Sequence, residues 1–403
     1  MKKKALSIVL TSAMVVSLAA CGSSQEPAQT TPAENTATDS ASETATTEAA
    51  TEAAEGESAA SEATTETAAA DITVDGKIAL ITDSGDITDE SFNQTTWEGV
   101  CAFGDKYGIE YNYYKPAEDT DEERLNSIDL AVAEGATAVV LPGYLFGPAL
   151  ADAQTTYPDV NFIAVDVSEG DLGGVALESN AYACTFMEEQ AGYLAGYAAV
   201  KDGYTKLGFL GGMAVPAVIR YGYGYVQGIN AAAEEMGVDV EVKYTYGGQF
   251  YGDASITAKM ESWYEQGTEI VFACGGGIYT SALEAAENYD GKVIGVDVDQ
   301  KPIIGDRCVT SAMKGLQATV VDKLTKLFTG NWAEIGGKND NLGLADGDYI
   351  GLPTDDASWG FKTFTKDEYQ TVVDGIKDGS ITISNDTENQ PEVGEHTTVD
   401  YID

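Results

Sequence analysis

Residues 78–82 of this chain read Ile-Ala-Leu-Ile-Thr, and residues 83–94 continue Asp-Ser-Gly-Asp-Ile-Thr-Asp-Glu-Ser-Phe-Asn-Gln. The first run is apolar and has the length of a buried strand. The polar stretch after it therefore lies where a parallel sheet opens its ligand crevice. Carboxylates, an aromatic ring and an amide are gathered there, which predicts a site for a neutral, polar, flat ligand. The alternative is an ordinary loop in which Asp86 and Asp89 cap the next helix and Phe92 packs inward.

The same alternation of apolar run and helical pattern continues after residue 70. Further apolar runs lie at 109–114, 138–141, 161–167, 206–210, 238–244, 270–273, 292–298 and 309–311. Stretches with helical periodicity lie between most of them, for example 120–134, 182–201, 217–236 and 256–266. This order predicts an α/β fold with doubly wound parallel sheets, in which every strand ends at the same edge of its sheet.

Residues 71–403 exceed the size at which one hydrophobic core stays compact, so we expect two lobes that face each other across a cleft. The predicted lobes are 71–180 plus 301–345 and 181–300 plus 346–403. The predicted crossings between them are 178–182, 299–302 and 336–351. Three such crossings form a hinge, which is the layout of type I periplasmic-binding-protein folds.

The amino terminus has the pattern of a bacterial lipoprotein signal peptide. Lys2, Lys3 and Lys4 precede an apolar stretch, 5–18, which leads to Leu-Ala-Ala-Cys ending at Cys21. The apolar stretch is shorter than the roughly 20 residues that span a bilayer, so we expect cleavage and a lipid on Cys21. An ordinary secretory signal is the alternative, and the residues ahead of the cysteine disfavour it.

Residues 22–70 consist almost wholly of Ala, Thr, Ser and Glu, with no Lys or Arg. Such a segment cannot bury a core, and its like charges repel each other. We therefore expect a disordered, extended acidic tether that holds the folded part away from the membrane. The predicted location is the outer face of the bacterial cytoplasmic membrane, and the length of the tether suits a Gram-positive surface.

The chain carries a formal net charge of −44. This charge disfavours binding to nucleic acid and to anionic membrane surfaces, and it favours a neutral or cationic ligand. His396 is the single histidine, which leaves little room for histidine chemistry. The sequence also lacks a phosphate-binding GxxxxGK[ST] loop, and the spacing of Gly222 and Gly224 does not match a dinucleotide fingerprint. We predict no cofactor and no metal.

The four cysteines after Cys21 are far apart and lie in apolar surroundings, so we expect small core residues. They are Cys101, Cys184, Cys274 and Cys308. Their spacing leaves open whether any two of them form a disulfide.

The string from Asp83 to Gln94 resembles the signature of the basic membrane protein family of lipoproteins. The characterised members of that family are nucleoside-binding components of ABC importers. The resemblance extends over essentially all of Asp71–Pro353. It implies a receptor that closes on a purine nucleoside (guanosine, inosine or adenosine) and delivers it to an ABC permease in the membrane.

The resemblance also implies ligand-binding residues in the first loop. Phe92 matches one of two aromatic rings that sandwich the purine. Asp83 matches an aspartate that accepts hydrogen bonds from the base edge, Asn93 matches an amide that faces the ligand, and Asp166 matches another carboxylate in the cleft. Ionised carboxylates only accept hydrogen bonds, so they favour ring N–H and amino donors.

Further matches lie in the second half of the chain. Residues 209–221 resemble a strand-to-helix turn in which Tyr221 stands where the family normally has the second stacking Phe. Gly275 follows a strand, where a glycine allows backbone N–H groups to approach a ligand. Asp297 matches an aspartate that binds the ribose diol, and Lys314 matches a lysine for the ribose. Gly315 departs from an arginine common in the family, which puts the neighbouring contacts in doubt.

Three other functions are compatible with parts of the pattern. A type I binding protein for a sugar also uses aromatic rings with Asp, Asn and Arg. An enzyme such as a nucleosidase could use Asp83, Asp166 and Asp297 as acid and base, although no metal motif accompanies them, and we expect no enzyme. A surface adhesin would use the anchor and tether, but the sequence shows no exposed aromatic or basic patch.

Overall fold

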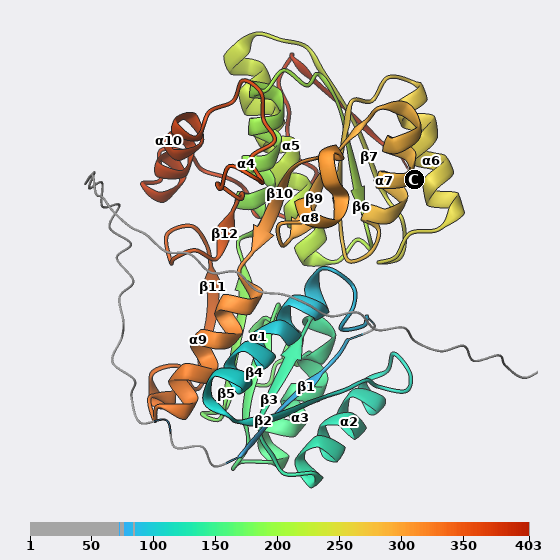
Figure 1. Cartoon of the computed structure of the whole chain (residues 1–403). Coiled ribbons are helices and arrows are strands. Elements are labelled where there is room, and N and C mark those ends of the chain that lie inside the picture. Colours follow the sequence, from blue (N-terminus) through green and yellow to red (C-terminus); the bar gives the residue numbers. More distant parts are fainter. Residues whose placement is uncertain (1–71, 73–75, 84, 403) are drawn as a thin grey trace, which may run out of the picture. The chain divides into compact units, whose positions relative to one another are not determined.

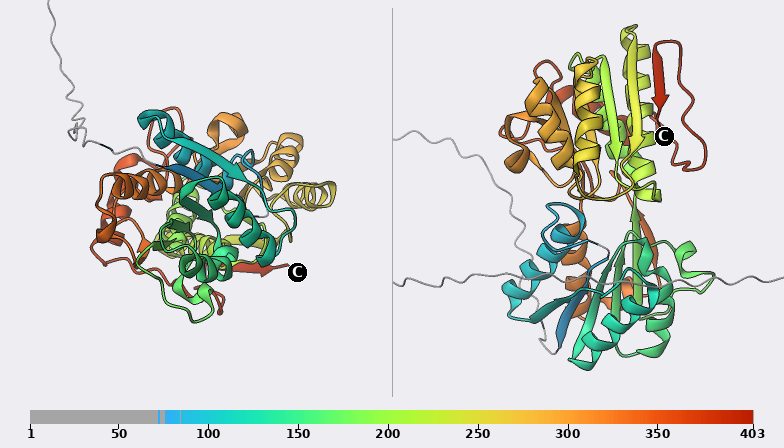
Figure 2. Two further views of the ribbon diagram at one scale, coloured as in Figure 1. Left: turned by 90° about the horizontal axis from the view of Figure 1, so that it is seen from below. Right: turned by 90° about the vertical axis from the view of Figure 1, so that its right-hand side faces the viewer.

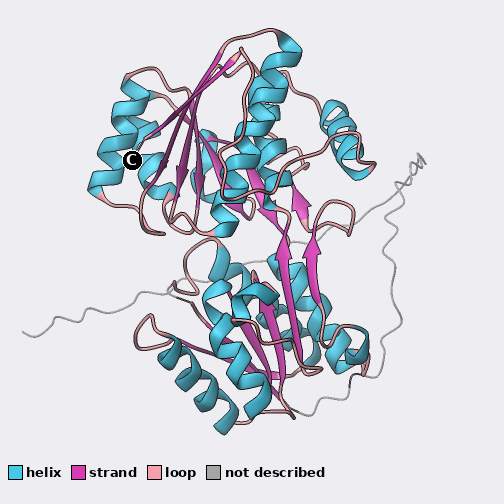
Figure 3. Ribbon diagram, turned by 180° about the vertical axis from the view of Figure 1, so that it is seen from behind, coloured by secondary structure: helices cyan, strands magenta, loops and turns pink. Residues whose placement is uncertain are grey.

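The computed structural model describes Ile72, 76–83 and 85–402, all of which belong to one compact unit, Thr65–Asp403. The predicted signal peptide, Cys21 and the tether at 22–70 lie outside the described residues. Two sheets, each with helices on both faces, form two lobes (Figures 1 and 3). This architecture confirms the expected α/β class.

The first sheet has the strand order β11-β5-β4-β3-β1-β2, and all its pairings are parallel. Its strands are β1 (Lys77–Ile81), β2 (Glu110–Tyr114), β3 (Ala136–Pro142), β4 (Asn161–Val165), β5 (Ala181–Phe186) and β11 (Asn339–Leu342). Its helices are α1 (Phe92–Tyr107), α2 (Asp121–Ala133), α3 (Gly147–Thr156) and α9 (Leu316–Phe328), with short 3-10 turns η1 (Tyr144–Phe146), η2 (Glu169–Leu172) and η4 (Trp332–Glu334).

The first sheet is buried on both faces, as the apolar run of β1 indicates. Ile78 and Leu80 pack with α1 and α9 on one face, while Ala79 and Ile81 pack with α2 and α3 on the other. Successive side chains of a strand point to opposite faces, so a strand covered on both sides is apolar throughout.

The second sheet has the order β12-β10-β9-β8-β6-β7-β13, and only β12 is antiparallel to its neighbour. Its strands are β6 (Lys206–Gly211), β7 (Val240–Tyr246), β8 (Ile270–Cys274), β9 (Lys292–Asp297), β10 (Cys308–Lys314), β12 (Ile350–Gly351) and β13 (Thr397–Tyr401). Its helices are α4 (Glu188–Lys201), α5 (Pro216–Met236), α6 (Ala254–Glu265), α7 (Tyr279–Tyr289), α8 (Lys301–Ile304) and α10 (Lys366–Lys377), with the 3-10 turn η3 (Gly305–Arg307).

The two sheets repeat one topology. Strands β2-β1-β3-β4-β5 and β7-β6-β8-β9-β10 have the same order, in which the second strand along the chain pairs outside the first and the third pairs on the other side. This is the order of doubly wound folds whose ligands bind where the strand order reverses. Figure 2 shows the two lobes from two further directions, with helices packed against the sheet of each lobe.

The chain crosses between the lobes three times, as expected, but two crossings are displaced from their predicted positions. Strand β5 pairs in the first sheet, so the crossing expected at 178–182 comes after Phe186. Strand β10 pairs in the second sheet, so the crossing expected at 299–302 comes after Lys314. The third crossing, between β11 and β12, lies inside the predicted 336–351.

The predicted lobe boundaries at 180/181 and 300/301 therefore need correction. The chain leaves each sheet only after its fifth strand, and an apolar run does not reveal which sheet a short strand will join. For the same reason the helix expected over 182–201 begins only at Glu188, after a strand buried between two neighbours.

Helices α4 and α5 approach each other unusually closely through glycines. A Cβ on Gly192 would lie 2.1 Å from the Tyr221 carbonyl oxygen, and a Cβ on Gly224 would lie 2.1 Å from the Glu189 carbonyl oxygen. Only glycine allows two helix backbones to approach so closely. The contact places the first turn of α4 beside the first turns of α5.

The four cysteines of the described part are free, and Cys184, Cys274 and Cys308 are buried as expected. Cys101 is half-buried. Among the described residues, no helix has the length and apolar character needed to cross a membrane.

Candidate functional site

A pocket of about 790 Å³ lies at the carboxyl ends of the central strands of both sheets. Its walls include Asp83 after β1 and Gly143 after β3 in one lobe, and Met213 after β6 and Gly275 after β8 in the other. These are the positions where the strand order reverses in each sheet. The volume is in the usual range for small-molecule sites, about 300–1,000 Å³.

The loop after β1 is organised around Asp89 and Asp83. Asp89 accepts hydrogen bonds from the backbone N–H groups of Asn93 (2.9 Å) and Gln94 (3.1 Å), and so caps helix α1. Asp83 accepts from the side-chain amide of Asn93 at 2.8 Å and from Gly85 N–H at 2.7 Å. The expectation of a capping role for Asp89 is confirmed.

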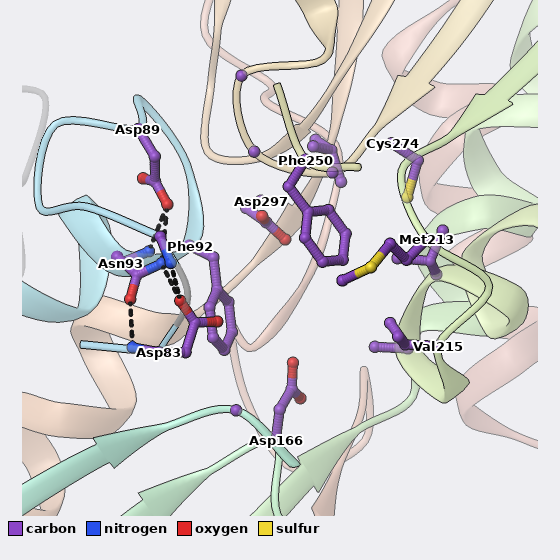
Figure 4. Close-up of a pocket in the computed structure, with 18 of the residues that line it drawn as sticks. Asp83, Asp89, Phe92, Asn93, Asp166, Met213, Val215, Phe250, Cys274 and Asp297 are labelled. Carbon is purple, nitrogen blue, oxygen red and sulfur yellow. Dashed lines mark hydrogen bonds between the residues drawn. The ribbon is translucent and has the colours of Figure 1, made fainter. Parts of the chain in front are cut away.

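Asn93 is engaged within its own loop as well as lining the pocket. Its Nδ2 donates to Asp83 and also to Asp89 (3.1 Å), and its Oδ1 accepts from Asp83 N–H at 3.3 Å. The side chain is 3% exposed. The amide therefore fixes the orientation of the Asp83 carboxylate at the pocket wall (Figure 4).

Asp166 and Asp297 occupy equivalent places in the two sheets. Asp166 follows β4 and Asp297 ends β9, and these are the fourth strands of the repeated topology. Both have a left-handed backbone, with φ of 56° and 63°. This conformation is unusual for a residue other than glycine and is often found at functional sites.

Lys314 links the two lobes through a buried group of charges. Its Nζ lies 2.5 Å from Asp166 Oδ2 in the first lobe and 3.1 Å from Glu188 Oε1 at the start of α4. Glu188 Oε2 also accepts from Arg220 Nε at 2.6 Å. The other Asp166 oxygen, Oδ1, is buried and has no hydrogen-bond partner among the described residues.

Asp297 makes different contacts, although its position is equivalent. Its Oδ2 accepts from the Ser91 hydroxyl at 2.5 Å, across the cleft, and its Oδ1 lies 3.5 Å from the Tyr221 hydroxyl. The Ser91 hydroxyl stands at the start of α1 but does not cap it, because Asp89 does so. A second contact across the cleft is the hydrogen bond from Gln300 Nε2 to the Glu90 carbonyl (3.0 Å).

Burial raises the pKa of three of the carboxyls that line the pocket, Asp83, Asp166 and Asp297. The pKa of Asp83 rises to about 6, although the donors Gly85 and Asn93 oppose the shift. The pKa of Asp166 rises to about 7 against the pull of the Lys314 ammonium, and that of Asp297 rises as well. A ligand that donates hydrogen bonds to these groups would favour their ionised forms.

The second lobe contributes a largely apolar wall. Phe250, Met213 and Val215 lie on the side of the pocket opposite Asp83, Phe92 and Asn93 (Figure 4). Phe250 is half-buried, and the surrounding glycines leave room for its ring. A Cβ on Gly212 or Gly275 would lie 2.4 or 2.8 Å from Phe250 Cδ1.

Tyr221 lies beneath this wall and shows little of its ring to the pocket. Its side chain is 2% exposed, and its hydroxyl donates to the Ala312 carbonyl at 3.3 Å. Phe250 therefore offers an aromatic face in the second lobe, which the sequence reading did not identify. The sequence does contain an indication of this role, because Phe250 lies in a glycine-rich loop directly after a strand, Gly247-Gly-Gln-Phe-Tyr-Gly252.

All eight predicted ligand-binding residues line this one pocket. They are Asp83, Phe92, Asn93, Asp166, Tyr221, Gly275, Asp297 and Lys314. The predicted lipidation site, Cys21, is outside the described residues. Within the described part of the chain, no group of His, Cys, Asp and Glu side chains has the arrangement of a metal site.

Two lobes joined by three crossings, with a polar and aromatic pocket between them, define a solute-binding protein of the type I fold. The family model for the PnrA-like substrate-binding proteins of ABC transporters, called Bmp, matches residues 77–384. The chain therefore belongs to this family, and its class is that of an ABC transporter substrate-binding protein.

Individual relatives agree with this assignment. The chain is 31% identical over 232 residues to BmpA of Lactococcus lactis, an ABC transporter nucleoside-binding protein, covering 54% of this chain and 63% of that relative. It is 28% identical over 317 residues to the CD4+ T-cell-stimulating antigen of Listeria monocytogenes, covering 73% and 85%. An ABC transporter solute-binding protein from Aeropyrum pernix has the same fold, with a TM-score of 0.68 and 19% identity, covering 77% of this chain and 94% of that structure.

Proposed function

We propose that the chain captures purine nucleosides in the interlobe pocket and delivers them to an ABC permease. The observation that carries this proposal is the combination of aromatic rings from both lobes with the buried carboxylates of Asp166 and Asp297 and the half-buried carboxylate of Asp83 in one pocket. A flat base with N–H and amino donors, joined to a sugar diol, is complementary to such a site. The naming of the Lactococcus relative as a nucleoside-binding protein supports the same ligand class.

In this proposal the base stacks between Phe92 and Phe250. Each stack is worth about 1–3 kcal/mol and tolerates different bases, which fits guanosine, inosine and adenosine alike. Asp83, oriented by Asn93, accepts hydrogen bonds from base donors. Asp166 would accept another once the ligand reaches its buried Oδ1, which has no partner among the described residues. Tyr221 supports the site from below and Gly275 makes room for Phe250.

The ribose diol is assigned to Asp297, because one carboxylate can accept from two adjacent hydroxyls. The diol would replace Ser91, which donates to Asp297 Oδ2 at 2.5 Å. Lys314 lines the same pocket and would contribute a donor to the ribose. Asp86, Asp119 and Asp171 also line the pocket, so we expect nucleotides to bind more weakly than nucleosides.

Delivery would follow the closing of the two lobes. Only the closed form buries the stacked base and the diol, and the permease would recognise that form. A lipid on Cys21 and the tether at 22–70 would keep the receptor at the outer face of the cytoplasmic membrane, on a Gram-positive surface.

The lipid anchor is tested separately. Globomycin, which inhibits the lipoprotein signal peptidase, should leave the full-length precursor uncleaved, and Cys21→Ser should abolish labelling by a fatty-acid probe.

The ligand assignment is tested by a thermal-shift screen of the chain, refolded to remove carried-over ligand. A ligand at 100 times its Kd stabilises a protein by about 2.7 kcal/mol. We expect a shift with guanosine, inosine or adenosine, a smaller one with GMP, and none with ribose. A shift with hexoses alone would identify a sugar receptor instead, and release of free base from guanosine would identify an enzyme.

A further inference from the structure

Glu188 is buried behind the pocket wall and does not line the pocket. It is the first residue of α4, directly after the first crossing between the lobes, and its side chain is 0% exposed. Although burial favours the neutral form, the Lys314 and Arg220 cations outweigh it and lower the pKa of Glu188. A fully buried, ionised carboxylate next to a binding site needs a structural explanation.

The close contact of α4 and α5 places Glu188. Gly192, Gly196, Gly224 and Gly228 lack the Cβ atoms that would hold the helices apart, so the first turn of α4 lies against the first turns of α5. Glu188 Oε2 then reaches Arg220 Nε at 2.6 Å. Arg220 and the helix backbone therefore hold the Glu188 carboxylate in place independently of Lys314.

The second oxygen of Glu188 faces Lys314 at 3.1 Å. Lys314 is the last residue of β10, at the second crossing, and its ammonium also contacts Asp166 in the other lobe. The carboxylates of Asp166 and Glu188 therefore balance the charges of Lys314 and Arg220. This group of charges lies at two of the three crossings between the lobes. Within this group, Asp166 Oδ1 is the carboxylate oxygen left without a partner among the described residues.

We propose that Glu188 is a positioning residue of the ligand site, which holds the Lys314 ammonium so that Asp166 and Asp297 keep acceptor capacity for the ligand. The ammonium contacts Glu188 and Asp166, and Asp297 lies at the end of the neighbouring strand β9; of these carboxylates, Asp166 and Asp297 line the pocket. Without Glu188 the ammonium would turn to these two and occupy the oxygens that the ligand needs. The geometry is independent of ligand identity, whereas the affinity test below rests on the proposed nucleoside function.

The test compares Glu188→Gln with the matched control Glu189→Gln in the full chain. Glu189 is also buried, at 5% exposed, but makes no contact with Lys314, and its Oε2 has no partner among the described residues. Glu188→Asp is the second variant, because it keeps the charge on a side chain one methylene shorter. Thermal unfolding of each variant establishes that it is folded at the temperature of the binding measurement.

The first readout is the nitrogen-15 chemical shift of Lys314 Nζ and the rate at which its ammonium hydrogens exchange with water, both measured by NMR at pH 7 without added nucleoside and assigned by their loss in Lys314→Arg. We expect Glu188→Gln to change the shift and speed the exchange, because it removes the charged acceptor at 3.1 Å, Glu188→Asp to change them less, and Glu189→Gln to leave them unchanged. A shift and an exchange rate in Glu188→Gln equal to those of the wild type would overturn the proposal, whatever the ligand is. If Glu188→Gln does not fold, the same comparison is made with Glu188→Asp.

The second readout is the affinity for guanosine by calorimetry. We expect a loss of at least tenfold in Glu188→Gln, a smaller loss in Glu188→Asp and less than a twofold change in Glu189→Gln. A changed Lys314 resonance with unchanged affinity would overturn the positioning role. A wild-type protein that binds no guanosine, together with a Lys314 resonance that changes in Glu188→Gln, would instead count against the nucleoside assignment and leave the Glu188 contact established.

Discussion

The two lobes share the order of their first five strands and differ in what they place at the strand ends. The first lobe presents polar groups that are organised by its own loop, with Asp83 and Asn93 hydrogen-bonded to each other beside Phe92. The second lobe presents an apolar surface formed by Met213, Val215 and Phe250, and the Phe250 ring packs against glycine residues. The shared topology places the pocket, and the loop residues decide which chemistry each wall offers.

The comparison is sharpest for Asp166 and Asp297, which have the same topological position and the same left-handed backbone. Asp166 pairs with a cation from the other lobe and keeps one oxygen without a partner among the described residues. Asp297 pairs with neutral hydroxyls, one of them from the other lobe. Equivalent positions can therefore carry different contacts, because the partners are different residues: Lys314 at the end of β10 for Asp166, and Ser91 and Tyr221 for Asp297.

The largest effect is expected for Asp297→Ala. Removing the carboxylate that accepts from both ribose hydroxyls should weaken guanosine binding at least about a hundredfold, since each hydrogen bond to a charged group contributes about 1.5–3 kcal/mol. Asp166→Ala should cost less, about tenfold, because Lys314 keeps Glu188 as a partner. The affinity of both variants for guanosine is measured by calorimetry, with the exposed Asp306→Ala as control. A larger loss of affinity in Asp166→Ala than in Asp297→Ala would contradict the roles assigned to the two aspartates.

The next effect concerns the aromatic rings of the two lobes. Phe92→Ala and Phe250→Ala should each weaken guanosine binding by roughly five- to a hundredfold, the equivalent of about 1–3 kcal/mol for a lost stack. Tyr289→Ala is the control, because this tyrosine is 43% exposed and does not line the pocket. Tyr221→Leu removes the ring, whereas Tyr221→Phe keeps it and removes only the hydroxyl that contacts Asp297. A larger loss in Tyr221→Leu than in Phe250→Ala, with little loss in Tyr221→Phe, would identify Tyr221 as the second stacking ring.

The smallest effect is a dependence of affinity on pH that comes from the first lobe. Burial raises the pKa of Asp83 to about 6, and a base that donates to its carboxylate binds the ionised form. Affinity should therefore be highest above pH 7 and fall about tenfold by pH 5 from Asp83 alone, with Asp166 adding to the loss.

Asp83→Asn should flatten this pH profile, because an amide does not titrate. An affinity that rises as the pH falls would show that a protonated Asp83 donates to the ligand. The stability of the folded protein depends on pH in the opposite direction to the affinity. In the ligand-free protein the raised pKa favours the folded state at low pH, and this contribution is lost as the pH rises from about 4 through about 6.

Much of the fold could be predicted because strand and helix patterns are local. The run Ile78–Thr82 is apolar on both faces, and the structure buries it between two helix layers. The sequence pattern predicts a helix over 182–201, whereas Ala181–Phe186 forms the fifth strand. Its pairing with β4 and β11 depends on segments far away in the chain, so its own residues do not reveal it. The short strands at 339–342, 350–351 and 397–401 were missed for the same reason.

The site was predicted in a similar way. Residues at strand ends, such as Asp83, Asp166 and Asp297, could be named from their position after an apolar run. Phe250 could not be ranked above Tyr221, because the exposure of a ring depends on what packs around it. Glu188 had no signal at all, since its partners are 32 and 126 residues away in the sequence.

By itself, the sequence determined the α/β class, the two-lobed architecture and the residues at the strand ends, because these depend on hydrophobic periodicity and on the direction of parallel strands. The tertiary structure alone decided where the chain crosses between lobes, which aromatic ring faces the pocket and which partner each carboxylate has. These depend on close approaches between distant segments, such as the glycine contact of α4 and α5 that brings Glu188 to Arg220 and Lys314. Such contacts carry no local pattern, because each partner reads as an ordinary helix or strand residue until the other is beside it.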